Sequence, residues 1–465
     1  MGFSRTLAVW SSDLSFDDLP EAVVPWVKAA VPDFLAVSAA GSQADGVEIL
    51  NTYVRSQYAN GSATVIGQSN RMSAEAAALL NGTISHWEEY DDVTFGMWGH
   101  PSVALMPALF AVAETEGGSG KDFIVSYVAG FEACAKVGRL ITPQQVKLGW
   151  HPTATVGTIG AATAVGRLLG LDPVQLENAI GMAGSHSSGL RIQFGTMVKP
   201  LHAGLASRGG LASAMLSRAG FIGMPGVIEH PHGFAHALSG GAPADIEAFE
   251  RQLGEPLEIL DPGLAFKRFP SNFQTQSAAT GALSLRHKHG IRPEQIEEIV
   301  VLANHLMKLS LIHPEPKTGL EAKLSLNYAI AAALVDGQLE VEQYRVNRVQ
   351  DPQIRAMLKK IRLEPHPEMA GVDFTQGAHF LFVELIAKLT DGREVRERVS
   401  EGFSVPGVEG SAPHPQLLDK FRRNARRILS NERVETIINI VNDLENLKNV
   451  GEVISMVSKQ SEYAS

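Results

Sequence analysis

TVGTIGAATAVGRLLGLDP, residues 155–173, is the stretch of sequence that decides the expected fold class. Its first fifteen residues predict a helix whose faces are rich in glycine and alanine, and Gly170-Leu171-Asp172 predicts a turn into a second helix that runs to Ser187. Small side chains let two helix backbones approach closely, so we expect both helices at the centre of a helical bundle. Arg167 and Asp172 interrupt the apolar pattern, which argues against membrane helices.

The sequence before and after this stretch is also typical of helices. Apolar residues recur at helical spacing in four further segments, residues 20–40, 73–87, 121–140 and 201–219. Pro25 and Pro32 lie inside the first of these segments, so we expect that helix to kink or split. From Leu19 to about Pro225 the chain is therefore expected to be helical.

The pattern changes after about Leu260. Residues 295–302 (QIEEIVVL) alternate and are rich in β-formers, which predicts a strand, and residues 324–335 predict an apolar helix. Residues 380–389 and 394–399 predict a β-hairpin, because the Asp-Gly pair between them supplies the positive φ that a tight turn needs. From Pro415 onward the sequence is helical again, with an amphipathic stretch over residues 432–444.

These patterns predict a mainly α fold in two domains. A large all-helical domain is built from both chain ends, residues 1–265 and 405–465, and a smaller α+β lid domain, residues 266–404, is inserted between them. The length of 465 residues allows two or three domains. We expect the cleft between the two domains near Leu264 and Val405.

Composition excludes several classes of protein. With 40 Lys and Arg against 50 Asp and Glu, the formal charge of −10 argues against a nucleic-acid binder. Cys134 is the only cysteine, in a predicted helix interior, so no intrachain disulfide and no cysteine-based zinc site is expected. The sequence has no run of about 18 apolar residues and no basic segment followed by an apolar core near Met1, so we expect no membrane partner and a cytoplasmic location.

Three separate segments gather basic side chains in this acidic chain. GWHPT (149–153) contributes His151, GTMVKPLHAG (195–204) contributes Lys199 and His202, and FKRFPS (266–271) contributes Lys267 and Arg268. If these segments converge, they would bind a small polyanion, and neighbouring lysine and histidine would lower each other's pKa values. The alternative is that each is a solvated surface run.

An acidic segment, HWEEYDD (86–92), is followed by GHPS (99–102). Its four acids could hold a divalent metal, serve as general acids or bases, or form a solvated loop after a helix. Because the acids are almost consecutive, they cannot all point one way on a helix. One or two of them could still hold a Mg²⁺ ion weakly.

Together these segments resemble the MmgE/PrpD family over nearly the whole chain. The resemblance is carried by NGTISHWEEYDD (81–92), GHPS (99–102), GWHPT (149–153), GTMVKPLHAG (195–204), KRFP (267–270) and SLNYAIAAAL (325–334). It implies a helical domain from both chain ends with an α+β lid, usually a homodimer, and, for the decarboxylase and epimerase members, no metal or organic cofactor. It also implies that the acidic segment is a wall of the active site, so we expect metal-free catalysis, with Glu89 acting as an acid or an orienting group near His100. It also implies active-site roles for the following residues: His100, His151, Lys199, Lys267 and the lid tyrosine Tyr328.

The sequence departs from the family in its acidic segment. Glu89 stands where the family commonly has Asp, and the threonine that usually follows the Asp pair is displaced, with Val93 preceding Thr94. Family members include 2-methylcitrate dehydratase, cis-aconitate decarboxylase and iminodisuccinate epimerase. These activities share the ionisation of a carbon that bears or adjoins a carboxylate, for which fixed cations stabilise the developing charge.

We expect a cofactor-independent epimerase that acts on a small dicarboxylate such as iminodisuccinate. A dehydratase or decarboxylase of small polycarboxylates is the alternative, and a non-enzymatic helical scaffold is a third. The residues expected to be catalytic are His100, His151, Lys199, Tyr328 and Glu89. Those expected to bind substrate are Lys267, Arg268 and His202.

Overall fold

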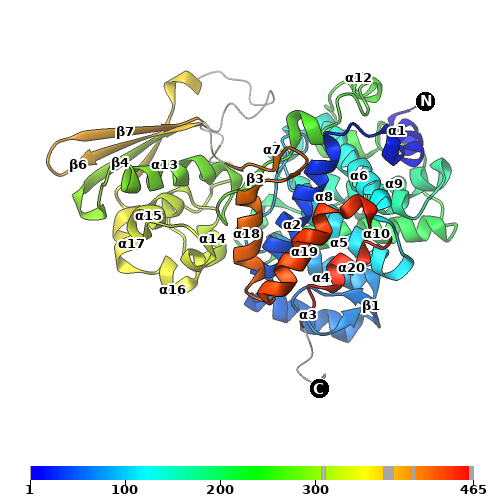
Figure 1. Cartoon of the computed structure of the whole chain (residues 1–465). Helices are drawn as coiled ribbons and strands as arrows, with labels where there is room; N and C mark the ends of the chain where they lie inside the picture. The colour runs from blue at the N-terminus through cyan, green and yellow to red at the C-terminus, as the bar shows by residue number, and fades with distance from the viewer. Residues whose placement is uncertain (1, 305–306, 308–309, 370–381, 401–403, 460–465) are drawn as a thin grey trace.

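The computed structural model describes residues 2–304, 307, 310–369, 382–400 and 404–459. Over these residues the fold is mainly α with small sheets, which confirms the predicted fold class. Figure 1 shows a large group of helices beside a smaller group that carries the long strands. We use "body" for residues 2–265 and 404–459, and "lid" for residues 266–400.

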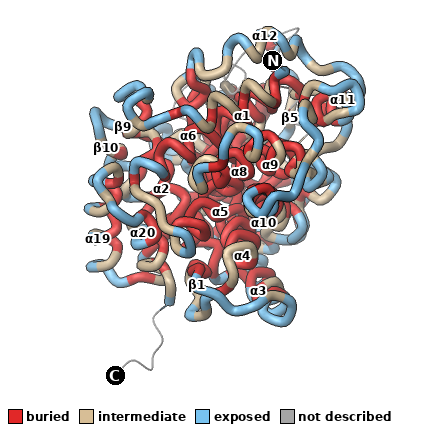
Figure 2. The backbone as a smooth tube through the Cα atoms, turned by 90° about the vertical axis from the view of Figure 1, so that its right-hand side faces the viewer, coloured by how far each residue is buried: buried red, intermediate tan, exposed pale blue. Residues whose placement is uncertain are grey.

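The glycine- and alanine-rich helix lies at the centre of the body, as predicted. This helix, α8 (Pro152–Leu168), packs on α5 (Pro101–Glu116), α6 (Gly120–Ile141) and α10 (Val198–Arg218), and α10 in turn packs on α4 (Ala74–His86). A Cβ at Gly160 would lie 2.8 Å from the carbonyl oxygen of Gly130, so only glycine permits this approach of α8 to α6. In Figure 2 these helices form the buried centre of the molecule.

Further helices surround this centre, and the C-terminal helices return to it. Helix α18 (Pro415–Ala425) packs along α2 (Val23–Gly41), although nearly 400 residues separate them in sequence (Figure 1). The remaining elements of the body are α1 (Phe3–Asp13), α2 (Val23–Gly41), α3 (Asp45–Gln57), β1 (Asn60–Thr64), β2 (Arg71–Met72), α7 (Gln144–Lys147), α9 (Pro173–His186), α11 (Phe234–Ser239), α12 (Ile246–Arg251), α18 (Pro415–Ala425), α19 (Asn431–Asn442) and α20 (Gly451–Ser455).

The segment that was expected to kink or split does not split, because α2 is one helix of 19 residues. Pro25 lies in its first turn, where no intrahelical donor is needed, and Pro32 lies buried inside the helix. The neighbouring helices α4 and α18 pack on α2. Among the described helices α2 is long and apolar enough to cross a membrane, but 89% of its apolar window is buried inside the fold, which is typical of a core helix.

The lid is built on a four-stranded sheet in the order β5-β4-β6-β7. β4 pairs parallel to β5 and antiparallel to β6, which forms a hairpin with β7. The predicted strand and hairpin are confirmed, although residues 380 and 381 lie outside the described residues. The bounds are β4 (Ile296–Ala303), β5 (Ile361–Pro365), β6 (Val383–Leu389) and β7 (Glu394–Val399), with α13 (Gln276–His287), α14 (Gly319–Ala322), α15 (Leu326–Asp336), α16 (Val346–Val349) and α17 (Pro352–Leu358).

The chain enters and leaves the lid at one place. β3 (Phe266–Lys267) pairs antiparallel with β8 (Ser404–Val405), so Phe266 lies opposite Val405. A short hairpin of β9 (Val408–Glu409) and β10 (Ala412–Pro413) then leads into α18. The predicted domain boundaries, after residues 265 and 404, fall within this pair of strands.

Candidate active site

Several buried polar side chains from distant parts of the chain meet at one place in the body. His86 ends α4, and the acidic loop (residues 87–92) follows it. His100 and His151 occupy the N-cap positions of α5 and α8. Each is followed by a proline at the first helical position, where its fixed φ suits a helix start. This local preference explains why both His-Pro pairs present an imidazole at a helix N-terminus.

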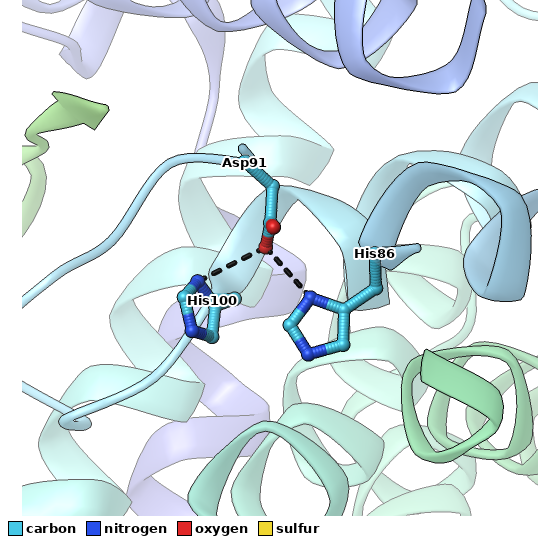
Figure 3. A group of neighbouring side chains, drawn as sticks. All are labelled: His86, Asp91 and His100. Atoms are coloured by element: carbon cyan, nitrogen blue, oxygen red, sulfur yellow. Dashed lines mark hydrogen bonds and ion pairs between the residues drawn. The ribbon is translucent and has the colours of Figure 1, made fainter. Parts of the chain in front are cut away.

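Asp91 lies between two imidazoles (Figure 3). Its Oδ2 is 2.9 Å from Nδ1 of His86 and 3.0 Å from Nδ1 of His100. All three side chains are buried. Although burial works to raise it, the two histidines and Lys267 hold the pKa of Asp91 well below its usual range. Asp91 is therefore a carboxylate that orients two imidazole rings.

Glu89 faces the lysine of α10. Its carboxylate forms an ion pair and a short hydrogen bond with Lys199, whose Nζ also lies 2.9 Å from Nε2 of His86. Burial would raise the pKa of Glu89, but Lys199 and Lys267 lower it to about 2. Burial in turn lowers the pKa of Lys199, and Glu89 opposes this. A carboxyl group with so low a pKa is not an acid near neutral pH, so of its two expected roles only the orienting one fits this geometry.

Four buried imidazoles form a row. Their ring centroids are 4.8 Å apart for His100 and His86, 5.8 Å for His86 and His151, and 5.3 Å for His151 and His202. Burial lowers the pKa of His100 and of His202 to about 4, and that of His151 falls well below its usual range through burial and Lys199. These three rings are therefore neutral near pH 7 and can accept a proton.

Lys267 on β3 completes the cluster from the side of the lid. It is fully buried, and its Nζ donates to the carbonyl oxygen of Glu89 at 2.8 Å and lies 3.8 Å from Oδ1 of Asp91. The predicted convergence of the basic segments thus holds for His151, His202, Lys199 and Lys267. We call this group, with His86, Glu89, Asp91 and His100, the polar cluster.

Comparisons with known proteins identify the family of the chain. Residues 5–247 match the MmgE/PrpD N-terminal domain, and residues 269–446 match the MmgE/PrpD C-terminal domain. The chain belongs to the MmgE/PrpD family. This confirms the family that the sequence motifs indicated.

Relatives within the family are named as lyases. The chain is 29% identical to a cis-aconitate decarboxylase of Mus musculus over 92% of this chain and 87% of the relative. It is 26% identical to a cis-aconitate decarboxylase of Aspergillus terreus over 94% of this chain and 92% of the relative. It is 22% identical to the 2-methylcitrate dehydratase of Escherichia coli K12 over 81% of this chain and 80% of the relative. These relatives support an enzyme of the family, but they give no support to the expected epimerase.

Arg268 does not join the polar cluster of this MmgE/PrpD chain. Its side chain is exposed, and its guanidinium lies 5.8 Å from the ring centroid of Phe269. Arg268 follows the last residue of β3, in a bend of the chain where its side chain faces solvent, whereas Lys267 is the fully buried end of that strand.

Tyr328 also lies apart from the cluster. It is fully buried in the core of the lid, and its hydroxyl donates a short hydrogen bond to the carbonyl oxygen of Gln343. Its ring centroid is 5.4 Å from that of Tyr344, and burial raises its pKa. In the described part of the chain its hydrogen bonds and ring contact involve Ser325, Gln343 and Tyr344 and no member of the polar cluster, so its catalytic role stays a prediction.

A metal ion would meet unfavourable charges here. Donor atoms of His86, Asp91 and His100 lie within 4.8 Å of one another, and Oδ1 of Asp91 has no hydrogen-bond partner. However, the ammonium groups of Lys199 and Lys267 lie 2.9 Å from His86 and 3.8 Å from Asp91, and they would repel a dication at such distances. Metal-free catalysis stays our prediction.

The four acids of the loop do not all point one way, as their spacing predicts. Glu88 pairs with Lys323 of the lid at 2.7 Å, while Glu89 and Asp91 face the polar cluster. Asp92 accepts a short hydrogen bond from Ser102, and burial raises its pKa well above its usual range.

Sequence reasoning quoted His86 and Asp91 without assigning either to the site, and it missed Phe194. His86 could have been found from its place at a predicted helix end, directly before the acidic loop. The ring of Phe194 covers the cluster, with its centroid 5.1 Å from Nζ of Lys199 and 5.1 Å from the ring of His151. The carbonyl oxygen of Phe194 accepts from Nε2 of His313 in the lid at 3.0 Å.

Proposed function

We propose that this protein is a lyase that decarboxylates a small tricarboxylate of the cis-aconitate type. The observation that carries the proposal is the meeting of two buried ammonium groups, Lys199 and Lys267, with a row of buried imidazoles. Decarboxylation is favoured over dehydration because the decarboxylases match 92–97% of the chain at 26–29% identity, whereas the dehydratases match 80–81% at 22–25%.

The polar cluster suits a polyanion. Ammonium groups in a buried, low-dielectric site attract carboxylates more strongly than they would in water. The N-termini of α5 and α8 direct their positive ends at the same place, where the N-cap residues are His100 and His151. Glu89 keeps Lys199 charged against the effect of burial, so the lysine is ready for the substrate.

The reaction needs one proton and stabilisation of negative charge. When the bond between a carbon and a departing carboxylate breaks next to a double bond, its electron pair forms a new double bond. The electrons of the old double bond then take up a proton, so a trianion and one proton give a dianion and carbon dioxide. The charge that develops beside a remaining carboxylate is stabilised by Lys199 and Lys267.

The histidine row is suited to supply the proton. His100 and His151 are neutral in the free site, because burial lowers the pKa of both imidazoles, with Lys267 adding to this effect at His100 and Lys199 at His151. A bound trianion places opposite charge beside them and raises these pKa values, so an imidazole gains a proton as the substrate binds. His100 and His151 are the proposed donors, since each projects from a helix N-terminus into the cluster.

Dehydration is the second candidate, and 2-methylcitrate dehydratases among the relatives favour it. In that reaction one imidazole removes the proton α to a carboxylate and a second protonates the leaving hydroxyl. Epimerisation would use the same pair of groups to move a proton from one face to the other, and no relative supports it.

One experiment separates these reactions. The protein is incubated with cis-aconitate, 2-methylcitrate or iminodisuccinate in deuterated water and followed by NMR. Release of carbon dioxide with one deuteron in the product supports the decarboxylase, and loss of water supports the dehydratase. Solvent exchange without net loss would instead identify an epimerase. If no acid reacts, the lyase proposal fails.

A further inference from the structure

Directly behind the polar cluster lies another buried lysine, Lys420, which comes from the C-terminal helix α18. It is fully buried, and its Nζ donates to Oδ1 of Asp33 at 2.6 Å, to the carbonyl oxygen of Tyr90 at 2.7 Å and to that of Lys267 at 3.1 Å. The same ammonium lies 4.0 Å from the ring centroid of Tyr90. All three of its hydrogen bonds are thus directed to defined acceptors.

Two of these acceptors belong to the backbone of the candidate active site. Tyr90 stands between Glu89 and Asp91 in the acidic loop. The hydrogen bond from Lys420 to the carbonyl oxygen of Tyr90 therefore holds the backbone between these two acids in place. The second carbonyl belongs to Lys267 of β3, whose own side chain donates to the carbonyl oxygen of Glu89. Lys420 therefore joins the backbone of the acidic loop to the backbone of β3, and through them it fixes the distance between their charged side chains.

Stability alone gives a poor reason for burying this ion pair. Taking two charges out of water is costly, and replacing a buried pair by apolar residues is often neutral or stabilising. Asp33 and Lys420 are exposed by 1% and 0%, so they bear this cost in full. The two backbone carbonyls that only an ammonium at this position can reach supply the missing reason.

We propose that Lys420 is a positioning residue of the active site, one that holds the acidic loop against β3 so that Glu89 and Asp91 face Lys199, Lys267 and His100. The inference rests on the proposed function, because it assigns Lys420 to that same site. Its hydrogen bonds go to Asp33 and to the backbone of Tyr90 and Lys267, so it acts on the imidazoles of the polar cluster through these groups.

The test uses Lys420→Met together with a double variant, Asp33→Asn with Lys420→Met, which removes both charges and leaves no buried charge unpaired. Because small displacements of catalytic groups are costly, we expect kcat to fall about 10- to 100-fold in both variants, with a smaller change in KM. The pH profile of kcat/KM should also shift, since Asp91 and Glu89 set the pKa values of the groups around them.

Lys28→Met is the matched control. Lys28 is also buried and also joins α2 to the C-terminal region, where its Nζ donates to the carbonyl oxygen of Asn442 at 2.8 Å and to Glu445 at 2.7 Å. It contacts nothing in the acidic loop or β3. This variant should lower the melting temperature while leaving kcat and the pH profile as in the wild type.

Hydrogen exchange provides a readout that does not depend on the reaction. Amides of residues 87–92 and 264–268 should exchange faster in both Lys420 variants and not in Lys28→Met. If the wild type turns over none of the acids, the proposed function fails while faster exchange still supports the positioning role. A folded double variant with wild-type kcat, pH profile and exchange overturns the inference, and so does unfolding of both Lys420 variants, which would assign the lysine a structural role.

Discussion

The body and the lid each direct a buried lysine at the same acidic loop, and the difference between them is instructive. Lys199 of the body pairs with Glu89 and also reaches the imidazole of His86, so it stands among groups that can move protons. Lys323 of the lid pairs with Glu88 at 2.7 Å and donates to the carbonyl oxygen of Trp87 at 3.0 Å, with no imidazole among these contacts. Apart from Lys267 at the start of the lid, the body therefore holds the reacting groups, and the lid contacts residues beside them.

The same division appears at Phe194. Its ring lies over Lys199 and His151, whereas its carbonyl oxygen is bound by His313 of the lid. Tyr328, which the family resemblance assigns to the site, lies inside the lid's own core. If this division holds, changes in the body should affect the chemistry, and changes in the lid should mainly affect how well the site is closed.

The largest effect is expected from Lys199→Met. It removes an ammonium that stabilises the transition state and leaves Glu89 buried without its partner. We expect kcat/KM to fall by about 1000-fold or more, measured by product formation at saturating and low substrate. A near-normal kcat/KM that does not respond to salt would contradict the role given to Lys199.

The next effect concerns acid stability. An unfolded histidine takes up a proton near pH 6.5, but folded His100 does so only near pH 4, so between these values the unfolded chain binds more protons. The free energy of unfolding is therefore at its full value above pH 6.5 and falls as the pH drops toward 4, by roughly 3 kcal/mol for this residue. Denaturant unfolding should show that His100→Asn loses less free energy of unfolding between pH 6.5 and pH 4 than the wild type does. Equal losses in the two proteins would contradict the low pKa assigned to His100.

Glu89→Gln should have the third effect. Removing the anion beside Lys199 lowers the pKa of that lysine further, so the alkaline limb of the pH profile should move to lower pH. We expect kcat/KM near neutrality to fall by about 100-fold. Full activity with an unchanged alkaline limb would remove Glu89 from the mechanism.

Lys323→Met tests the lid's side of the comparison. It removes the lid's contact with the acidic loop and leaves every member of the polar cluster in place. We expect kcat/KM to decrease about 10-fold, mainly through a higher KM, because the substitution affects closure of the site and not the reacting groups. A loss of kcat as large as that of Lys199→Met would contradict the division in which the body carries out the chemistry and the lid closes the site.

The smallest effect is expected from metal removal. Because Lys199 and Lys267 oppose a dication at the histidine and aspartate donors, exhaustive chelation should leave the rate unchanged. The measurement is activity before and after dialysis against a chelator. Loss of activity that one added divalent metal restores would contradict the metal-free prediction.

The sequence predicted the fold better than it predicted the site. Helical spacing identified α8 and α10, and the Asp-Gly turn identified the lid's hairpin, because both patterns are local. His100 and His151 were predictable for the same reason, since a His-Pro pair before a helix determines where its imidazole points. The split considered for α2 did not occur, since Pro25 falls in the first turn and α2 continues past Pro32 as one helix packed against its neighbours.

The remaining site residues depend on long-range packing. KRFP gave no sign that Lys267 points inward and Arg268 outward, because a two-residue strand is too short to show alternation. Asp91 gains its role from two histidines that the chain brings together only on folding. Lys420 stands in a strongly basic helix beside Arg422 and Arg423, where nothing in the sequence separates the buried cation from the solvated ones.

The return of α18 to the body sets the order in which a growing chain becomes functional. Every member of the polar cluster lies between residues 86 and 267, so all of them are synthesised well before Lys420. Until α18 has been made, the carboxylate of Asp33 lacks its partner and an apolar side of α2 stays uncovered. A nascent or truncated chain that stops before residue 415 thus carries every group of the cluster, but it presents an open helix face to chaperones and proteases instead of a finished site.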